Sequence, residues 1–300
     1  MDLSGVGVWS HHLRYGDPAQ SAEAAAELDE LGFTALWIPD AGGPVLDSVD
    51  HLLSSAKHTV IATGILNLWM HEPSDVAARY ASLTETYGER FLMGIGCSNA
   101  PLVDAGEPGR FRKPLAATRS FLDALEAAEQ PVPVQNRVVG ALGQKMLELS
   151  ATRAHGAHPY LGTPDHTRQA REVLGDGPLL LPEQTVVLTG DRDEARAIGT
   201  DWLRTYLTLP NYSNRLLRSG FTADEVSSVS DRVFDAIIAW GDEETVHRRV
   251  TEHRAARSGP RLRASPHGRP TGIPARRVAP TGRRPAVVAP GVARGAIAAW

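Results

Sequence analysis

Side chains able to do chemistry follow a short apolar run at residues 90–101. The run Arg90-Phe-Leu-Met-Gly-Ile-Gly96 is typical of a buried parallel strand, because it is apolar and ends in small residues. Cys97, Ser98 and Asn99 then offer a thiol, a hydroxyl and an amide. Ligands of α/β proteins bind at the carboxyl ends of such strands. The stretch predicts either one wall of a ligand pocket or a core strand followed by an ordinary surface turn.

Three histidines, His11, His12 and His71, also follow predicted strands. A histidine near a redox centre can protonate a substrate or product, because its pKa lies close to neutrality. We take His11 and His71 as candidate catalytic residues, with an ordinary loop position as the alternative for each. The eleven histidines show no spacing with cysteine or carboxylates that matches a metal site, so no metal is expected.

Seven strand-then-helix alternations position these residues. Strands are expected at 6–9, 33–38, 59–68, 90–96, 137–142, 156–161 and 182–188. Helices are expected at 18–31, 46–56, 73–87, 114–128, 144–154, from 164, at 191–207 and at 242–254, with a helical insertion near 208–230. The alternation predicts a TIM-type (β/α)₈ barrel. An open doubly wound sheet has less support, since no Gly-x-Gly-x-x-Gly opens a helix after a strand.

Composition narrows the class of protein. The chain has 300 residues and a net charge of −4, but residues 1–256 hold 22 basic and 35 acidic residues. An acidic domain is a poor binder of nucleic acid, so we expect no nucleic-acid partner. Cys97 is the single cysteine, which fits a reducing compartment. The first residues do not resemble a signal peptide and no long apolar stretch follows, so a cytoplasmic location is expected.

The segment 257–300 differs from the barrel domain at 1–256. It holds nine arginines, seven prolines and no acidic residue. Such composition predicts a disordered arm or a frameshifted end, with the eighth strand and last helix of the barrel missing or altered. Codons compatible with residues 257–263, read one base later, can encode Gly-Pro-Asp-His-Val-Cys-Val, a loop and strand in the expected place. A lost strand would leave the edges of the first and seventh strands exposed.

Several motifs together carry a family resemblance. They are Leu31-Gly-Phe-Thr-Ala-Leu-Trp-Ile-Pro-Asp40, Ala62-Thr-Gly-Ile65, Arg90–Gly96, Gly156-Ala-His-Pro-Tyr160 with Thr163-Pro-Asp-His-Thr167, and Leu209-Pro-Asn-Tyr-Ser-Asn214. Over residues 5–256 the chain resembles the bacterial luciferase-like monooxygenase superfamily, and within it the branch of oxidoreductases that use the deazaflavin coenzyme F420. The resemblance implies a TIM-type barrel, a flavin or deazaflavin at its C-terminal mouth, and hydride transfer to or from a small organic substrate.

The resemblance also implies where the cofactor ring lies. Asp40 would stand against the ring, or else cap a helix or sit in a loop. A bulge of the third strand, often with a strained peptide in relatives, would fall at Gly64–Ile65 or Leu66–Asn67; an ordinary strand glycine is the alternative. Gly96, Cys97, Ser98 and Asn99 would line the ring and its polyol arm. Relatives often carry a histidine at the position of Asn99 and an aliphatic residue at that of Cys97, and we expect Cys97 to act as a small apolar residue.

The cofactor tail would reach Gly140, Gly143, His158, Tyr160 and Thr163. Thr163 precedes Pro164 and is a candidate helix N-cap that could also bind a phosphate, with capping alone as the alternative. Two other functions stay open: an FMN-dependent monooxygenase that uses oxygen, and a non-catalytic flavin-binding relative. The insertion near 208–230 is expected to shape the substrate pocket, and relatives commonly form homodimers.

Overall fold

The computed structural model describes residues 1–258 and 296–299 of the chain. Its strands are β1 (Val6–Trp9), β2 (Ala35–Ile38), β3 (Val60–Thr63), β4 (Leu66–Asn67), β5 (Phe91–Gly96), β6 (Arg137–Val139), β7 (Gly156–Ala157), β8 (Leu179–Leu180), β9 (Glu183–Leu188), β10 (Ile238–Gly241) and β11 (Ala296–Ala299). Its helices are α1 (His12–Tyr15), α2 (Pro18–Glu30), α3 (Val45–Ser55), α4 (Pro73–Tyr87), α5 (Ala100–Gly106), α6 (Pro114–Ala127), α7 (Gln144–Arg153), α8 (Pro164–Leu174), α9 (Arg192–Leu207), α10 (Pro210–Arg218), α11 (Ala223–Ser228), α12 (Asp231–Ile237) and α13 (Glu243–Arg257), with a 3₁₀ turn at Val134–Asn136.

Local signals set several of these boundaries. Helix α4 begins with Pro73 in its first turn, where a missing backbone N–H does no harm. It ends at Gly88, whose φ of 73° lies in the left-handed region that favours glycine. The predicted bounds 73–87 are therefore confirmed. Helix α3 buries Val49, Leu52 and Leu53 along one face, as its spacing of apolar residues requires.

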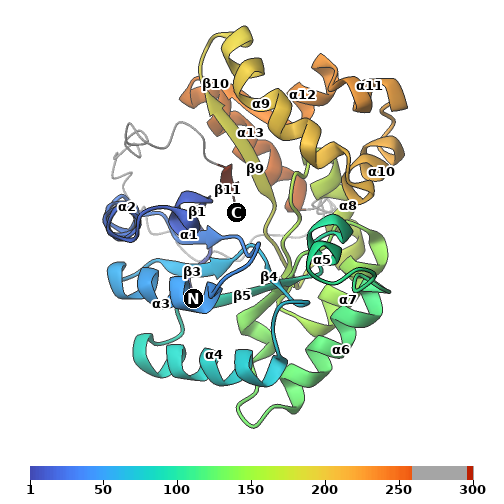
Figure 1. Ribbon diagram of the computed structural model, residues 1–300. Coiled ribbons are helices and arrows are strands. Elements are labelled where there is room, and N and C mark those ends of the chain that lie inside the picture. The colour runs from blue at the N-terminus through green and yellow to red at the C-terminus, as the bar shows by residue number, and fades with distance from the viewer. Residues whose placement is uncertain (259–295, 300) are drawn as a thin grey trace, which may run out of the picture.

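The sheet closes into a barrel. Its strand order is β10-β9-β11-β1-β2-β3-β5-β6-β7-β8, with β4 paired to β5. Strand β8 continues into β9 across Leu181 and Pro182. The last strand in this order, β8, is therefore joined along the chain to β9, which stands near the start of the order. The N–H of Leu181 donates to the carbonyl of Ala157, and the N–H of Glu183 donates to the carbonyl of Pro159. Figure 1 shows most of the strands at the centre with helices outside them, while β10 lies at the top beside α9, α12 and α13. The TIM-type α/β fold is confirmed.

The position beside β1 and β9 corrects one prediction. We expected the edges of the first and seventh strands to be exposed after loss of an eighth strand. Instead β11 lies between them and pairs antiparallel to both, with Gly7 opposite Ala298 and Thr185 opposite Ala296. A short antiparallel strand therefore occupies the place where a parallel eighth strand was expected, and both edges are paired. The rest of the predicted disordered or frameshifted segment, residues 259–295 and 300, lies outside the described residues.

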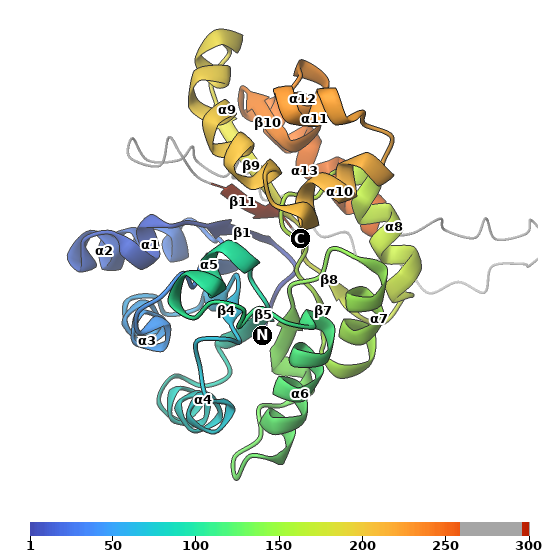
Figure 2. The ribbon, with the colours of Figure 1, turned by 45° about the vertical axis from the view of Figure 1, so that its right-hand side comes forward.

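A ring of helices covers the outside of the sheet. Contacts run in sequence from α2 to α3, α4, α6, α7, α8 and α13, and the turned view in Figure 2 shows the same succession. Most of the core lies between these helices and the strands. A second apolar cluster lies inside the barrel and contains Trp9, Trp37, Leu92 and Val138. The strands thus bury both of their faces, as expected of a parallel sheet.

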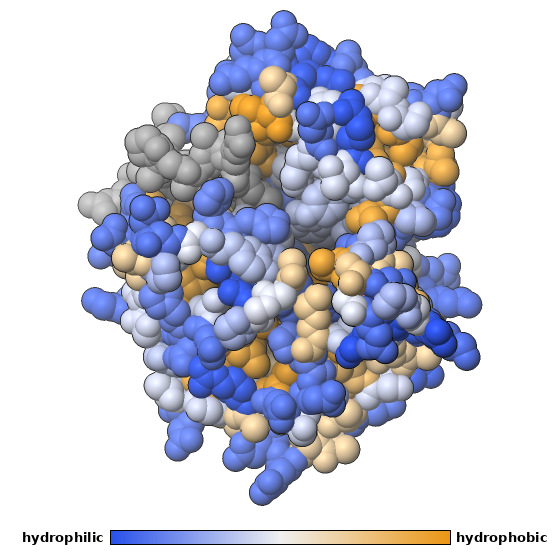
Figure 3. Space-filling model, viewed as in Figure 1, coloured by the Kyte–Doolittle hydropathy of each residue, from blue (hydrophilic) through white to orange (hydrophobic). Residues whose placement is uncertain are grey.

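The segment near 208–230 is helical. It consists of α10 and α11, and with α9 and α12 it packs an apolar core of its own, including Leu203, Leu216 and Phe234. These helices stand together at the top of Figure 1. On the face drawn in Figure 3, hydrophobic residues come to the surface in small separate patches. None of the helices among residues 1–258 is long and apolar enough to span a membrane.

Candidate functional site

The peptide between Gly64 and Ile65 interrupts the third barrel strand, where β3 ends and β4 begins. This peptide bond is cis. The indole Nε1 of Trp9 donates a hydrogen bond of 3.0 Å to the carbonyl oxygen of Gly64. A Cβ atom added at Gly64 would lie 2.5 Å from Trp9 Nε1 and 3.1 Å from His158 Nε2. Glycine is therefore required here by close approach of two side chains, not by an open turn.

The side chain of Ile65 accounts for two of the glycines that we expected near the cofactor. A Cβ atom at Gly96 would lie 2.7 Å from Ile65 Cγ1, and one at Gly140 would lie 3.0 Å from Ile65 Cγ2. Gly96 ends β5, and the N–H of Gly140 donates to the carbonyl of Ile95. Three neighbouring strand ends therefore pack around one aliphatic side chain.

Asp40, Asn67 and His71 meet at the same edge of the sheet. The buried carboxylate of Asp40 follows β2, and its Oδ2 accepts the backbone N–H of Asn67 at 3.0 Å and lies 2.7 Å from His71 Nε2. Its Oδ1 accepts the N–H of Gly42, so a loop role and a site role coexist. The side-chain Nδ2 of Asn67 is buried without a hydrogen-bond partner in the described part of the chain. A buried donor of this kind is available to an acceptor on a ligand.

The residues after β5 have mixed roles. Ser98 adopts a left-handed backbone (φ 54°) that turns the chain into α5. Asn99 is the N-cap of α5 and accepts the N–H of Leu102 at 3.1 Å. Burial raises the pKa of the Cys97 thiol, which keeps it protonated and apolar. The carbonyl of Cys97 accepts the indole N–H of Trp69 at 2.8 Å.

His158 lies beside the Gly64 peptide and Tyr160 lies beside Trp9, although we expected both residues at the cofactor tail. His158 is buried inside the barrel and stacks on Trp37 with ring centroids 4.2 Å apart. Its Nδ1 lies 2.7 Å from the carbonyl of Leu181, and burial lowers its pKa to about 4. The ring of Tyr160 lies 5.2 Å from that of Trp9. Both residues therefore belong to the wall of the barrel interior.

His11 stands at the end of β1, as predicted. Its ring lies 4.9 Å from Trp9 in an edge-on arrangement and 6.2 Å from Tyr15. Partial burial and the neighbouring His12 lower the pKa of His11, so it favours the neutral form. A neutral imidazole can accept a proton. His71 instead contacts a carboxylate, so the two histidines occupy different electrostatic settings.

The residues Gly143 and Thr163, which we expected near the cofactor tail, stand at two helix N-termini. Thr163 is the N-cap of α8, as predicted, and its Oγ1 accepts the N–H of His166 at 3.1 Å. Gly143 is the N-cap of α7 and has no side chain that could cap the helix. The first N–H groups of α7 therefore have no side-chain acceptor at the cap. His166 Nε2 lies 3.0 Å from the carbonyl of Leu142 and so connects α8 to the loop before α7.

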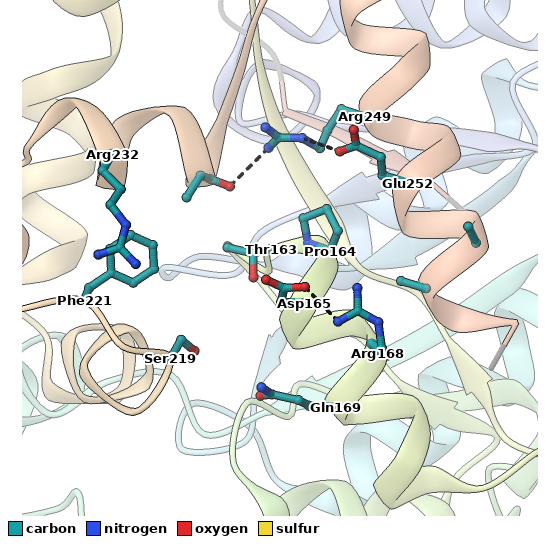
Figure 4. A pocket seen from close by; sticks show the side chains of 13 residues that line it. Thr163, Pro164, Asp165, Arg168, Gln169, Ser219, Phe221, Arg232, Arg249 and Glu252 are labelled. Atoms are coloured by element: carbon teal, nitrogen blue, oxygen red, sulfur yellow. Dashed lines mark hydrogen bonds and ion pairs between the residues drawn. The ribbon is translucent and has the colours of Figure 1, made fainter. Parts of the chain in front are cut away.

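A cavity of about 830 Å³ opens beside the N-terminus of α8 (Figure 4). Arg168 in this cavity pairs with Asp165 at 2.8 Å, and Arg249 pairs with Glu252 at 3.2 Å. Arg232 pairs with Glu225 and also lies over the ring of Phe221, 4.3 Å from its centroid. Because each arginine already has a carboxylate partner, the cavity is less basic than its residues suggest.

Two features of this region suit a flavin or deazaflavin. Such a cofactor has a flat ring with carbonyl acceptors and a side chain that ends in phosphate. The amide Nδ2 of Asn67, which has no partner among the described residues, can donate to a ring acceptor. The uncapped N-terminus of α7 beside Gly143 can bind a phosphate. The residues present therefore fit the cofactor class that the resemblance implies.

Comparison with known proteins identifies the family. A family model described as luciferase-like monooxygenase matches residues 2–261, so the chain belongs to this family. A curated protein of Mycobacterium tuberculosis, whose provisional name is coenzyme F420-dependent oxidoreductase, is 30% identical over 121 residues. That match covers 38% of this chain and 34% of the relative, so the chain matches about a third of the relative's length.

Solved structures share the fold at low sequence identity. An F420-dependent secondary alcohol dehydrogenase, solved with an F420–acetone adduct, aligns with a TM-score of 0.64 at 15% identity and covers 84% of this chain and 90% of its own. The F420-dependent tetrahydromethanopterin reductase of Methanopyrus kandleri gives 0.65 at 16% identity with the same coverage. The oxygenating constituent of 3,6-diketocamphane monooxygenase of Pseudomonas putida, solved with FMN, gives 0.61 at 14% identity, over 85% and 89%.

Proposed function

We propose that the chain is an oxidoreductase that transfers a hydride between coenzyme F420 and a small organic substrate. The observation that carries the proposal is the cluster of Asp40, Asn67 and His71 beside the Gly64–Ile65 peptide at the carboxyl ends of neighbouring strands. The F420-dependent name of the curated relative and of two structural neighbours supports this cofactor.

Each residue has a role in this proposal. Asn67 donates its free amide hydrogen to an acceptor of the ring, and Gly96, Cys97 and Ser98 border the ring. The N-termini next to Gly143 and Thr163 bind the phosphate. When bound, the deazaflavin supplies or accepts the hydride. The proton that accompanies the hydride is exchanged with His71, whose Nε2 lies 2.7 Å from Asp40 Oδ2, or is taken up by the neutral imidazole of His11.

An FMN-dependent monooxygenase is the second candidate. The family description and the FMN-bound diketocamphane monooxygenase favour it. Both candidates use the same ring site, so cofactor choice separates them. A relative that binds the cofactor without catalysis is a third outcome.

Titration with each cofactor tests the proposal. Purified protein is mixed with F420 or FMN, and binding is followed by cofactor fluorescence and the visible spectrum. Saturable binding of F420 without comparable binding of FMN is the expected result, together with F420 reduction by a member of a panel of alcohols and related donors. FMN-dependent oxygen uptake would replace the proposal with the second candidate. Binding without turnover on a broad panel would support the third.

We also propose a cytoplasmic enzyme with one barrel domain at residues 1–256, acting as a homodimer. The single cysteine and the acidic charge of that domain support the location. Light scattering on the purified chain measures the oligomeric state, and a monomer at micromolar concentration would contradict the dimer.

A further inference from the structure

The chain bends at Tyr160 and Leu161 after β7, and this bend, called here the Tyr160 turn, brings the ring of Tyr160 against Trp9. Leu161 adopts a left-handed backbone with φ of 56°, which non-glycine residues rarely do. Leu161 is itself buried and packs in the apolar core of the inserted helices. The conformation therefore persists only if surrounding groups hold it.

Two buried ionisable side chains hold this turn from different elements. Glu183 on β9 is 0% exposed, and its Oε2 accepts the N–H of Leu161 at 2.9 Å. Arg215 on α10 is 3% exposed and donates from Nη1 to the carbonyl of Tyr160 at 3.3 Å and from Nη2 to the carbonyl of Leu161. Every polar group of the Leu161 backbone is thus bonded to one of the two. The remaining oxygen of Glu183 accepts the hydroxyl of Thr185 at 2.8 Å.

Stability alone does not explain these two residues. In residues 1–258, neither forms an ion pair within 4.0 Å. Burial raises the pKa of Glu183 to about 7 and lowers that of Arg215 to about 10, so both pay a desolvation penalty. A buried charge without a close counter-ion is a weak way to stabilise a fold. Their hydrogen bonds are instead directed at the backbone N–H and carbonyl groups of the turn.

The turn connects the inserted helices to the proposed ring site. The ring of Tyr160 lies 5.2 Å from Trp9, 5.5 Å from Tyr206 and 6.3 Å from Tyr212. Trp9 in turn donates to the carbonyl of Gly64. Contacts therefore run from Arg215 through Tyr160 and Trp9 to the Gly64 peptide.

We propose that Glu183 and Arg215 are positioning residues that fix the Tyr160 turn, and through Tyr160 and Trp9 shape the wall against which cofactor and substrate bind. The inference rests on the proposed function in one respect, namely that the Gly64 peptide borders the bound ring. Neither residue touches the ring itself. The inserted helix α10 thereby contributes to the site through a backbone clamp.

Substitutions at Arg215 and Glu183 test the clamp. Arg215→Met removes the charge and both hydrogen bonds at similar volume, whereas Arg215→Lys keeps only the charge. Glu183→Ala removes the acceptor for the Leu161 N–H, whereas Glu183→Gln restores one. Arg218→Met on the same helix is the matched control, because Arg218 is exposed and, within the described residues, the bonds to the turn come from Arg215 instead.

Two readouts separate the clamp from the function. Hydrogen exchange of peptide 157–163 reports on the turn without any ligand: we expect at least tenfold faster exchange in Arg215→Met and Glu183→Ala, partial recovery in Arg215→Lys and Glu183→Gln, and no change in Arg218→Met. Cofactor titration reports on the site: we expect the dissociation constant to rise at least fivefold in Arg215→Met. In a Tyr160→Ala background, Arg215→Met should weaken binding no further, since it acts through Tyr160.

Each of the two measurements can overturn one part of the proposal independently of the other. Unchanged exchange in both disruptive variants overturns the clamp, even if binding falls. Additive losses in the Tyr160→Ala background overturn the route through Tyr160. If the unmodified protein binds neither F420 nor FMN, the proposed function fails while the exchange result still decides the clamp. Should Arg215→Met fail to fold, the Glu183→Ala and Glu183→Gln pair gives the same comparison.

Discussion

The indole nitrogen of Trp9 lies 3.0 Å from the carbonyl oxygen of Gly64 and donates a hydrogen bond to it, across 55 residues of sequence. This bond joins the end of the first strand to the peptide that interrupts the third. It fixes which way the Gly64 carbonyl points. A ligand that binds beside Ile65 therefore meets a preset backbone.

Trp9→Phe should weaken cofactor binding about fivefold. The substitution keeps an aromatic ring but removes the N–H, and one such hydrogen bond contributes roughly 1 kcal/mol. Trp240→Phe is the control, because it also deletes an indole hydrogen bond, to Asp235, but on β10. Fluorescence titration of both variants measures the difference. Equal affinities would show that the Trp9 bond does not matter for the site.

Asn67→Ala should separate folding from binding. The amide Nδ2 has no partner among the described residues, so deleting it costs little in the free protein, apart from the lost bond between Oδ1 and the Trp69 N–H. Binding should weaken roughly tenfold, because a donor to the ring is lost. Asn214→Ala, on an exposed position of α10, serves as control. A large fall in melting temperature with unchanged affinity would contradict this role.

Acid should destabilise the fold between pH 7 and pH 5. Burial lowers the pKa of His158 and His166 to about 4 and that of His253 to about 3. The unfolded chain takes up protons near pH 6.5, so it binds more protons than the folded chain in this window, and stability falls as the pH decreases. Each histidine contributes a loss of roughly 2 kcal/mol between pH 8 and pH 5.

Glu183 has the opposite effect on stability between pH 8 and pH 5. Its pKa is raised to about 7, so the folded state takes up a proton before the unfolded state does. Its contribution is greatest below pH 4.5 and is lost as the pH rises through 7. The combined effect of the three histidines is larger than that of Glu183, so the free energy of unfolding is expected to fall on acidification.

Urea unfolding at pH 8 and pH 5 measures this balance. His253→Gln should reduce the difference between the two pH values by roughly 2 kcal/mol, because His253 is buried between Thr167 and Gln184 and cannot titrate once replaced. His247→Gln, exposed on the same helix, should leave the difference unchanged. Greater stability at pH 5 than at pH 8 would show that the buried histidines do not determine the pH dependence of unfolding.

Local signals were enough for most of the barrel. Proline and glycine mark both ends of α4, and apolar runs mark β1, β2 and β5. Short elements were missed: β8 has two residues, too few for any periodicity, and β10 follows α12 without a break. Helix α5 was also missed, although Asn99 followed by Pro101 is a recognisable helix start.

Long-range contacts explain what the sequence could not predict about the site. The break at Gly64 and Ile65 was expected from the family resemblance, but the packing of Ile65 over Gly96 and Gly140 required the fold. Glu183 and Arg215 carry no motif, and both reach the Leu161 turn from elements distant in sequence. Contacts between residues so far apart in the chain leave no pattern in the sequence around either residue.

The proposed function requires the cofactor ring to bind beside the Gly64–Ile65 peptide, and Gly64→Ala alters the wall at that point. The new methyl group would meet Trp9 Nε1 at 2.5 Å and His158 Nε2 at 3.1 Å, so the wall must shift. Gly190→Ala is the matched control, since a Cβ there meets nothing within 4 Å. Both variants are checked for folding by circular dichroism and then titrated with F420. We predict at least tenfold weaker binding in Gly64→Ala and unchanged binding in Gly190→Ala. If a folded Gly64→Ala variant bound F420 as tightly as the unmodified protein does, the ring could not lie beside this peptide.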